Sequence, residues 1–322
     1  MRTEIFNQIK LWAQEEGFPV FGVCDLIPLQ RINAAFDTYL SRHYHAGMAY
    51  LENNVEKRKD PARLVEGARS IMVFLAPYPY QATCEENGLK IASYSKGIDY
   101  HFVIKNRLRK IIDRIIEIQP DFCGREFTDS APIFDRAWAA AAGTGFIGRN
   151  GLLINRELGN RVLIGTILSN LESGIKPDEN EIFQDRCGAC HRCIQACPSG
   201  ALVGPYTLDA RKCISYQTIE SRASFDEEAF DIDRHGWIFG CDECLRACPW
   251  YHKNKDGGWK EFITLREELR TMGEDDWKTM SNSAFKKRFL SSPLSRAGLK
   301  KIKNNLAYYD RQTTDRDSDP AE

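Results

Sequence analysis

The sequence predicts a mixed protein of the α+β or α/β class, with a cysteine-rich second unit and a helical end. Helical and strand-like apolar patterns alternate over residues 1–175, which predicts an N-terminal α/β domain. Most of the 11 cysteines gather between Cys187 and Cys248. Residues 256–309 are polar and mainly helical in pattern. Residues 310–322 are charged and short of apolar groups, which predicts a disordered tail.

The N-terminal domain begins with a helix, because apolar residues recur there at helical spacing, namely Ile5, Ile9, Trp12 and Ala13. Continuous apolar runs predict buried strands at Val20–Cys24 and Ile71–Leu75. The apolar face of residues 101–118 predicts a long helix. Arg161–Leu168 has the β-branched character of a further strand.

Eight clustered cysteines form two runs and one isolated member: Cys187, Cys190, Cys193, Cys197, Cys213, Cys241, Cys244 and Cys248. In the first run two, two and three residues separate successive cysteines, and a proline follows the last cysteine. In the second run two and three residues separate the three cysteines, and again a proline follows the last one. This spacing is typical of ligands for two 4Fe–4S clusters. Residues 176–255 are therefore predicted to form a ferredoxin-like domain that moves single electrons.

In such runs three thiolates reach one cluster, and the cysteine before proline reaches the neighbouring cluster. We assign the first cluster to Cys187, Cys190, Cys193 and Cys248, and the second to Cys197, Cys213, Cys241 and Cys244. Ile238 stands where a symmetrical second run would begin, so Cys213 would supply the missing thiolate. Zinc sites or disulfides are the alternatives, although zinc does not require this spacing and disulfides are rare in a reducing cytosol.

Gly143–Gly148 matches the pattern G-x-G-x-x-G. A dinucleotide-binding fingerprint follows a strand and opens a helix, whereas residues 134–142 have a helical pattern here. We expect these glycines to allow a tight turn or a close approach to a cofactor, not to bind a nicotinamide.

Length and charge fit an enzyme larger than an electron carrier, with 322 residues and a formal net charge of −1. The N-terminus lacks an apolar signal region and a twin-arginine signal, and no stretch is apolar enough to span a membrane, which predicts a cytoplasmic protein. Nothing demands more than a monomer. Cys24, Cys84 and Cys123 are scattered and odd in number, which predicts reduced, mostly structural thiols.

Five groups of residues, in chain order, resemble the epoxyqueuosine reductase family: Glu56–Pro61, Gly97–His101, Asp129–Pro132, Gly143–Asn150 and the eight-cysteine run. The resemblance covers about residues 1–308. It implies a cobalamin-binding N-terminal domain fed by two iron–sulfur clusters. The implied reaction is the last step of queuosine formation, in which two electrons and two protons remove the epoxide oxygen from the wobble base of tRNA. An unidentified low-potential donor would supply the electrons.

The resemblance also implies site residues. Asp129 is the expected proton donor, and we expect it to be enclosed beside the corrin, although such an aspartate is more often a helix N-cap. Asp99 and Tyr100 are candidates for substrate contact or proton supply, unless Asp99 simply begins the following helix. Arg58 would contact cobalamin, unless it is a solvated member of a charged run. The implied cobalamin contacts are Arg58, Asp129, Leu153, Ile164, Ser215 and Asp242.

Two groups of basic residues could contact tRNA phosphates. One contains seven residues without a local acidic neighbour: Lys286, Lys287, Arg288, Arg296, Lys300, Lys301 and Lys303. The other has only Asp113 opposing it and contains Lys105, Arg107, Arg109, Lys110 and Arg114. An ordinary solvated helix face is the alternative reading.

Two other functions fit parts of the sequence. A reductive dehalogenase combines the same two cofactor types, but such enzymes are typically exported behind a twin-arginine signal. A ferredoxin-type electron-transfer protein needs only the cysteine segment, so the N-terminal domain argues against it.

Overall fold

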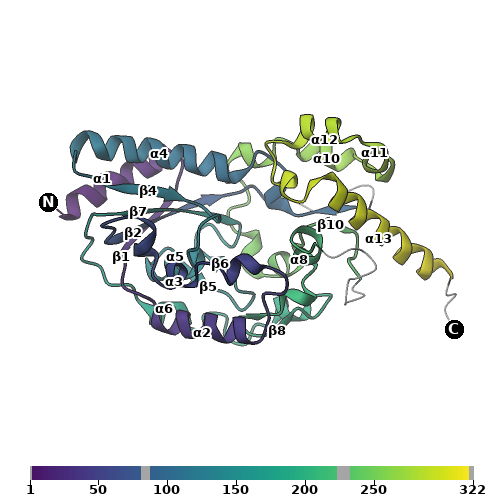
Figure 1. Cartoon of the computed structure of the whole chain (residues 1–322), viewed down its shortest axis with the longest axis horizontal. Helices are drawn as coiled ribbons and strands as arrows, with labels where there is room; N and C mark the ends of the chain where they lie inside the picture. The colour runs from purple at the N-terminus through teal and green to yellow at the C-terminus, as the bar shows by residue number, and fades with distance from the viewer. Residues whose placement is uncertain (1, 81–87, 223–232, 319–322) are drawn as a thin grey trace.

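The computed structural model describes residues 2–80, 88–222 and 233–318. A sheet with helices on both faces forms one end of the molecule, and the C-terminal helices form the other (Figure 1). Cys84 lies outside the described residues. No helix in the described ranges is long and apolar enough to cross a membrane.

A four-stranded antiparallel sheet lies at the centre of the N-terminal domain. Its order is β1 (Val20–Asp25), β2 (Ser70–Pro77), β7 (Val162–Ser169) and β4 (Gly124–Phe127). The α/β class expected for this domain is therefore wrong, and the α+β alternative is right. Alternating strand and helix patterns suggest parallel neighbours, but here every pair of neighbouring strands is antiparallel, because β7 lies between β2 and β4.

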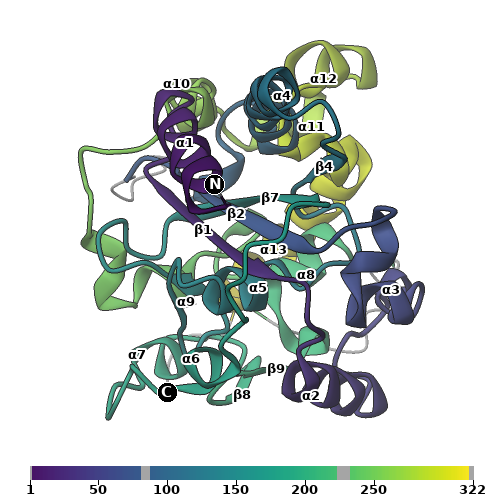
Figure 2. The same cartoon turned by 90° about the vertical axis from the view of Figure 1, so that its left-hand side faces the viewer.

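Helices cover both faces of the sheet (Figures 1 and 2). One face packs against α1 (Arg2–Glu15) and α4 (Tyr100–Ile118), and the other against α5 (Asp135–Ala141). Side chains of β2 alternate between the two cores: Met72 and Phe74 enter the first, and Ile71 and Val73 enter the second. This explains why the strand is apolar at every position from Ile71 to Ala76.

Shorter elements surround the sheet: α2 (Gln30–Ser41), α3 (Val55–Lys59), β3 (Lys90–Ile91), β5 (Phe146–Ile147) and β6 (Leu153–Ile154). The glycine-rich stretch of residues 143–148 follows α5 and leads into β5. A dinucleotide fingerprint has the reverse order, strand before helix, so the helix that we expected before this motif is confirmed.

The cysteine-rich segment folds into short elements: α6 (Glu179–Phe183), α7 (Arg192–Gln195), β8 (Leu202–Gly204), β9 (Thr207–Leu208), α8 (Ile214–Ile219), β10 (Trp237–Phe239) and α9 (Glu243–Arg246). Strand β10 pairs in parallel with β3 of the N-terminal domain. Arg161 adds a second connection. The residue is 1% exposed, and its guanidinium donates to the carbonyls of Tyr78, Tyr251, Lys253 and Asn254.

The C-terminal helices form a third core. They are α10 (Arg266–Thr271), α11 (Glu274–Thr279), α12 (Asn282–Phe289) and α13 (Gly298–Ser318). The expected disordered tail is wrong for residues 310–318, which continue α13. Ile302 and Leu306 anchor this helix in the core, and adding turns to a formed helix costs little. Residues 319–322 lie outside the described ranges.

Gly165 of β7 lets α4 lie close to the sheet. A Cβ atom there would meet Ile104 Cγ2 at 2.6 Å and Leu108 Cδ1 at 3.0 Å. We expect Gly165→Ala to lower the free energy of unfolding by about 1–3 kcal/mol, because both side chains are fully buried and must shift. Gly204→Ala is the control, since nothing lies within 4 Å of its Cβ position. Chemical denaturation of both variants tests this; equal stability would contradict it.

Candidate functional site

Four cysteines from two separate runs line one cavity. Cys187, Cys190 and Cys193 come from the first run and Cys248 from the second, and Arg149 and Arg192 also line the space. These are the four cysteines assigned above to the first cluster. Each run turns into a one-turn helix, and α7 packs against α9, which brings the two runs side by side.

The other four cysteines lie close to one another. Burial raises the pKa of Cys213, Cys241 and Cys244, and neighbouring thiols of the same set, including Cys197, raise it further. No disulfide links the cysteines of the described residues. A buried thiol is inert as a nucleophile, whereas iron binding removes its proton and balances the charge. Both sets therefore suit metal clusters.

A second polar site lies where β4 ends and α4 begins. The Tyr100 hydroxyl donates to Asp129 Oδ2 at 2.5 Å. Burial, followed by the Asp129 charge, raises the pKa of Tyr100 well above its ordinary value. Tyr100 therefore keeps its proton and acts as a hydrogen-bond donor to Asp129.

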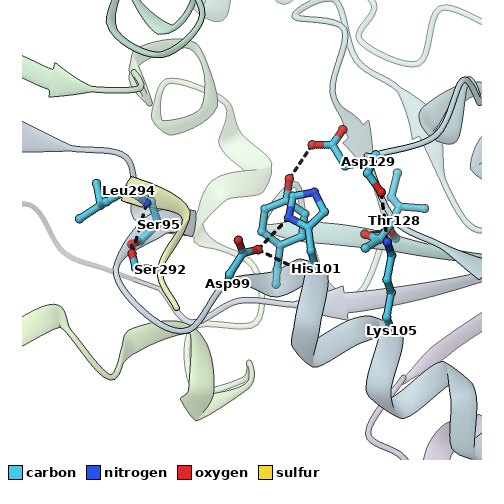
Figure 3. A network of polar contacts seen from close by, with 11 residues as sticks. Ser95, Asp99, His101, Lys105, Thr128, Asp129, Ser292 and Leu294 are labelled. Carbon is cyan, nitrogen blue, oxygen red and sulfur yellow. Dashed lines mark hydrogen bonds and ion pairs between the residues drawn. The ribbon is translucent and has the colours of Figure 1, made fainter. Parts of the chain in front are cut away.

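Asp99 caps α4 and also holds His101 (Figure 3). Its Oδ1 accepts from the His101 backbone N–H at 2.9 Å and contacts His101 Nδ1 at 2.7 Å. Burial opposes ionisation of Asp99, but the hydrogen bonds from His101 prevail and lower its pKa. The N-cap alternative is thus right, and an ionised Asp99 accepts hydrogen bonds instead of supplying protons.

Segments of the C-terminal region hold this site in place. The Asp99 backbone N–H donates to the Ser291 carbonyl at 2.6 Å, and Ser292 Oγ donates to the Ser95 carbonyl at 3.3 Å. Figure 3 shows this support on one side of Asp99 and the Asp129 loop on the other.

Asp129 differs from its expectation in two ways. Its side chain is exposed, not enclosed, because it lies on the loop between β4 and α5 with a left-handed backbone, φ 51°. It is also no helix N-cap, since α5 begins at Asp135 and is capped by Phe134. Asp129 therefore projects from the end of the sheet with its Oδ2 held by Tyr100.

Arg58 is buried, with 9% of its surface exposed, so the reading as a solvated charge is wrong. Its guanidinium lies 5.8 Å from the Phe36 ring centre and 5.9 Å from that of Phe134. Nη1 donates to the Ile133 carbonyl at 3.5 Å, while the shielded Nε has no partner. Burial lowers the pKa of Arg58, and the charge of Asp135 partly opposes this. An unpaired buried N–H of this kind fits a ligand acceptor.

The other implied cofactor contacts come from both domains. Leu153 and Ile164 pack in the same core, and the Ile164 carbonyl accepts from Thr128 Oγ1, next to Asp129. Asp242 is buried and accepts from the backbone N–H and the hydroxyl of Ser93 at 2.7 and 2.6 Å. Ser215 lies in α8, and no side-chain contact in the described residues joins it to the others.

Tyr94 stands between the two parts of the site, although nothing in the sequence singled it out. Burial raises its pKa, and the charges of Asp129 and Asp242 both raise it further. Its ring centre is 6.0 Å from that of Tyr100 and 6.4 Å from that of Phe239 in β10. Tyr94 therefore feels the charges of both Asp129 and Asp242 at the joint between the two domains.

The basic group between Lys105 and Arg114 is not the free surface that the sequence suggested. Acidic residues distant in sequence neutralise four of its members, in the pairs Arg107–Glu261, Arg109–Glu126, Lys110–Glu16 and Arg114–Glu15. Lys105 instead donates to Ser130 Oγ beside Asp129.

The second basic group is partly neutralised. Glu268 pairs with Arg288, and Glu220 pairs with Arg296. Lys303 donates to two backbone carbonyls, and Lys301 is buried. In the part of the chain that the structure describes, the exposed members without an acidic partner are Lys286, Lys287 and Lys300.

Two family models match the chain. Residues 58–130 match "Epoxyqueuosine reductase QueG, DUF1730", and residues 186–251 match the "4Fe-4S double cluster binding domain". The epoxyqueuosine reductase of Leadbetterella byssophila is 37% identical over 302 residues, covering 94% of this chain and 97% of the relative. That of Pseudomonas aeruginosa is 34% identical over 312 residues, covering 95% and 84%.

Solved structures agree with these matches. A crystal structure of selenomethionine-labelled epoxyqueuosine reductase has a TM-score of 0.85 at 26% identity and covers 99% of this chain and 84% of that one. Another, of epoxyqueuosine reductase with an epoxyqueuosine-modified tRNA-Tyr stem loop, has a TM-score of 0.80 at 25% identity and covers 96% and 81%.

The crossed cluster assignment makes a direct prediction for Cys213. We expect anaerobically reconstituted Cys213→Ala to lose mainly the second cluster, and so to hold about four irons in place of about eight. Cys123→Ala is the control, because Cys123 is exposed and belongs to neither set. Iron analysis with electron paramagnetic resonance tests this. Full iron content in Cys213→Ala would contradict the assignment.

Proposed function

The chain belongs to the epoxyqueuosine reductase family, and we propose that it reduces epoxyqueuosine to queuosine at the wobble position of tRNA. The observation that carries this proposal is the Tyr100–Asp129 hydrogen bond, which places an accessible carboxyl group at the joint with the cysteine-rich domain. A relative of the same fold has been crystallised with an epoxyqueuosine-modified stem loop, which supports tRNA as the partner.

Iron–sulfur clusters and cobalamin are the proposed cofactors. The two cysteine sets would hold the clusters, and the unpaired Nε of buried Arg58 fits an amide or phosphate oxygen of cobalamin. Leu153 and Ile164 would offer apolar contact, with Asp242 and Ser215 contributing from the other domain. When bound, cobalamin supplies a cobalt centre able to hold the two electrons that clusters deliver singly.

The protein's own part in the reaction is to bring a proton to the epoxide oxygen. Asp129 lies on an exposed loop, so a base flipped out of the anticodon can reach it. Tyr100 holds Oδ2, and within the described residues no hydrogen bond occupies Oδ1, which is left for the substrate. Because Tyr100 keeps its own proton, its hydroxyl also stabilises the carboxylate that remains once Asp129 has donated.

Two other functions are less well supported. A reductive dehalogenase would need no tRNA surface, and the curated relatives that span nearly the whole chain are epoxyqueuosine reductases. A ferredoxin-type electron-transfer protein has no use for the Tyr100–Asp129 pair or for a buried Arg58.

Mass spectrometry of the tRNA tests the proposed reaction. With reductant and cobalamin, we expect wild-type protein to remove one oxygen from epoxyqueuosine. Asp129→Asn should be slower by about 10²–10⁴-fold, because its amide cannot donate a proton as a carboxyl group does. Tyr100→Phe should be slower by about tenfold, because only one hydrogen bond to the carboxylate is lost.

Iron content and bound corrinoid of both variants provide the control, because neither side chain is assigned to a cluster. A wild-type protein that holds both cofactors but leaves the epoxide intact would refute the function. Full activity in Asp129→Asn would remove Asp129 from its role.

The free lysines of α12 predict the salt dependence of tRNA binding. We expect Lys287→Gln combined with Lys286→Gln to weaken binding roughly tenfold and to lower the salt slope by about two, since each lysine would neutralise one phosphate. Lys110→Gln is the matched control, because Glu16 already pairs with that lysine. Fluorescence anisotropy over a range of salt concentrations measures both. An unchanged slope in the double variant would place the tRNA elsewhere.

A further inference from the structure

The proposed reaction needs two protons, and Asp129 can carry only one of them at a time. Both C–O bonds of the epoxide break, a C=C bond forms, two electrons enter, and the oxygen leaves as water with two protons. The first proton is assigned to Asp129. A second group near the same loop could supply the other proton, and Asp99 is unsuitable because its pKa is lowered.

Asp135 lies where a second proton donor is needed. It is the first residue of α5, six residues after Asp129, at the far end of the same loop. The residue is half-buried, but its Oδ1 is shielded from solvent and has no hydrogen-bond partner. A buried, unpaired carboxylate oxygen is costly, whereas a protonated carboxyl group is tolerated there.

Burial and the charge of Asp129 also favour the protonated form of Asp135. Burial raises its pKa to about 8, and the negative charge of Asp129 contributes next. Arg136 of the same helix and Arg58 of α3 act in the opposite direction but do not prevail. The strands packed against α5 (β2, β5 and β6, with β7) carry no ionisable side chain. Of the glutamates of α6, Glu179 accepts from the backbone N–H of Arg31, and Glu181 pairs with the guanidinium of Arg186.

We propose that Asp135 is a second proton donor, which protonates the departing oxygen directly or by returning a proton to Asp129. This inference rests on the proposed function. As the second C–O bond breaks, the O–H bond of Asp135 breaks and its proton completes the water molecule, leaving a carboxylate. Solvent reprotonates that carboxylate before the next turnover.

A plain counter-ion role for Arg58 does not account for these observations. In the described residues Asp135 and Arg58 form no ion pair, and both keep a shielded polar atom without a partner. The charge of Arg58 also affects the pKa of Asp135 less than the charge of Asp129 does. The charge of Asp129 therefore influences Asp135 more than the guanidinium of Arg58 does.

The test uses the enzyme loaded with clusters and cobalamin, and epoxyqueuosine-bearing tRNA, in single turnovers from pH 6 to about 9.5. We expect the wild-type rate to fall as the pH rises through about 8, because Asp135 loses its proton there. Infrared spectroscopy of the protein without substrate gives an independent readout. A protonated carboxyl band should disappear over the same pH range.

Asp135→Asn should be at least about tenfold slower at pH 7, should lack the alkaline fall near pH 8, and should lose the infrared band. Asp135→Glu should retain both the band and the fall, although the pH of each shifts. Asp121→Asn is the matched control, because that aspartate is exposed beyond the end of α4. It should behave as wild type in every measurement.

A flat wild-type rate up to pH 9.5 would overturn the inference without any variant, and so would an Asp135→Asn protein with wild-type rate and profile. If Asp135→Asn fails to fold, the wild-type profile and Asp135→Glu decide. A wild-type protein that never converts the epoxide would refute the proposed function, and the inference would fail with it.

Discussion

This structure depends on one requirement: several ionisable groups are buried, and no other group of the chain balances their charge. Three cysteines of the second set have raised pKa values because of burial, and Arg58 and Asp135 each keep a shielded polar atom unpaired. Such groups cost stability unless a ligand pairs with them. Metal clusters would balance the thiolates, a cofactor oxygen would pair with Arg58, and a retained proton would neutralise Asp135. The same features that weaken the protein alone are those that suit it to cofactors and proton transfer.

These buried groups can act together only if the two domains are held firmly in place, because residues of both domains form the site. Strand β10 pairs with β3, Asp242 accepts two hydrogen bonds from Ser93, and Arg161 binds four carbonyls on both sides of the joint. Tyr94 lies in this joint under the influence of Asp129 and Asp242. The cysteine-rich segment is therefore placed beside the Asp129 loop by backbone pairing and buried polar bonds, which are specific in geometry.

Local sequence patterns predicted the cysteine sets, the long helix α4 and the three main strands, because ligand spacing and apolar periodicity are local signals. Strand direction was missed, since it depends on how the connections run in three dimensions. The exposed position of Asp129 and the neutralised basic face of α4 were missed for a similar reason. Glu15, Glu16, Glu126 and Glu261 are distant in sequence from the residues they pair with. Asp135 looked like any acidic residue at a helix start, and only its shielded Oδ1 distinguishes it.

An electron count on the loaded protein tests the central claim most directly. The protein is reduced anaerobically, freed of excess reductant, mixed with epoxyqueuosine-bearing tRNA, and quenched for nucleoside analysis. The account predicts one queuosine for every two electrons lost from the protein, and none from protein whose clusters have been removed. Electrons that stay on the protein while the epoxide remains intact, or queuosine formed without the clusters, would contradict it.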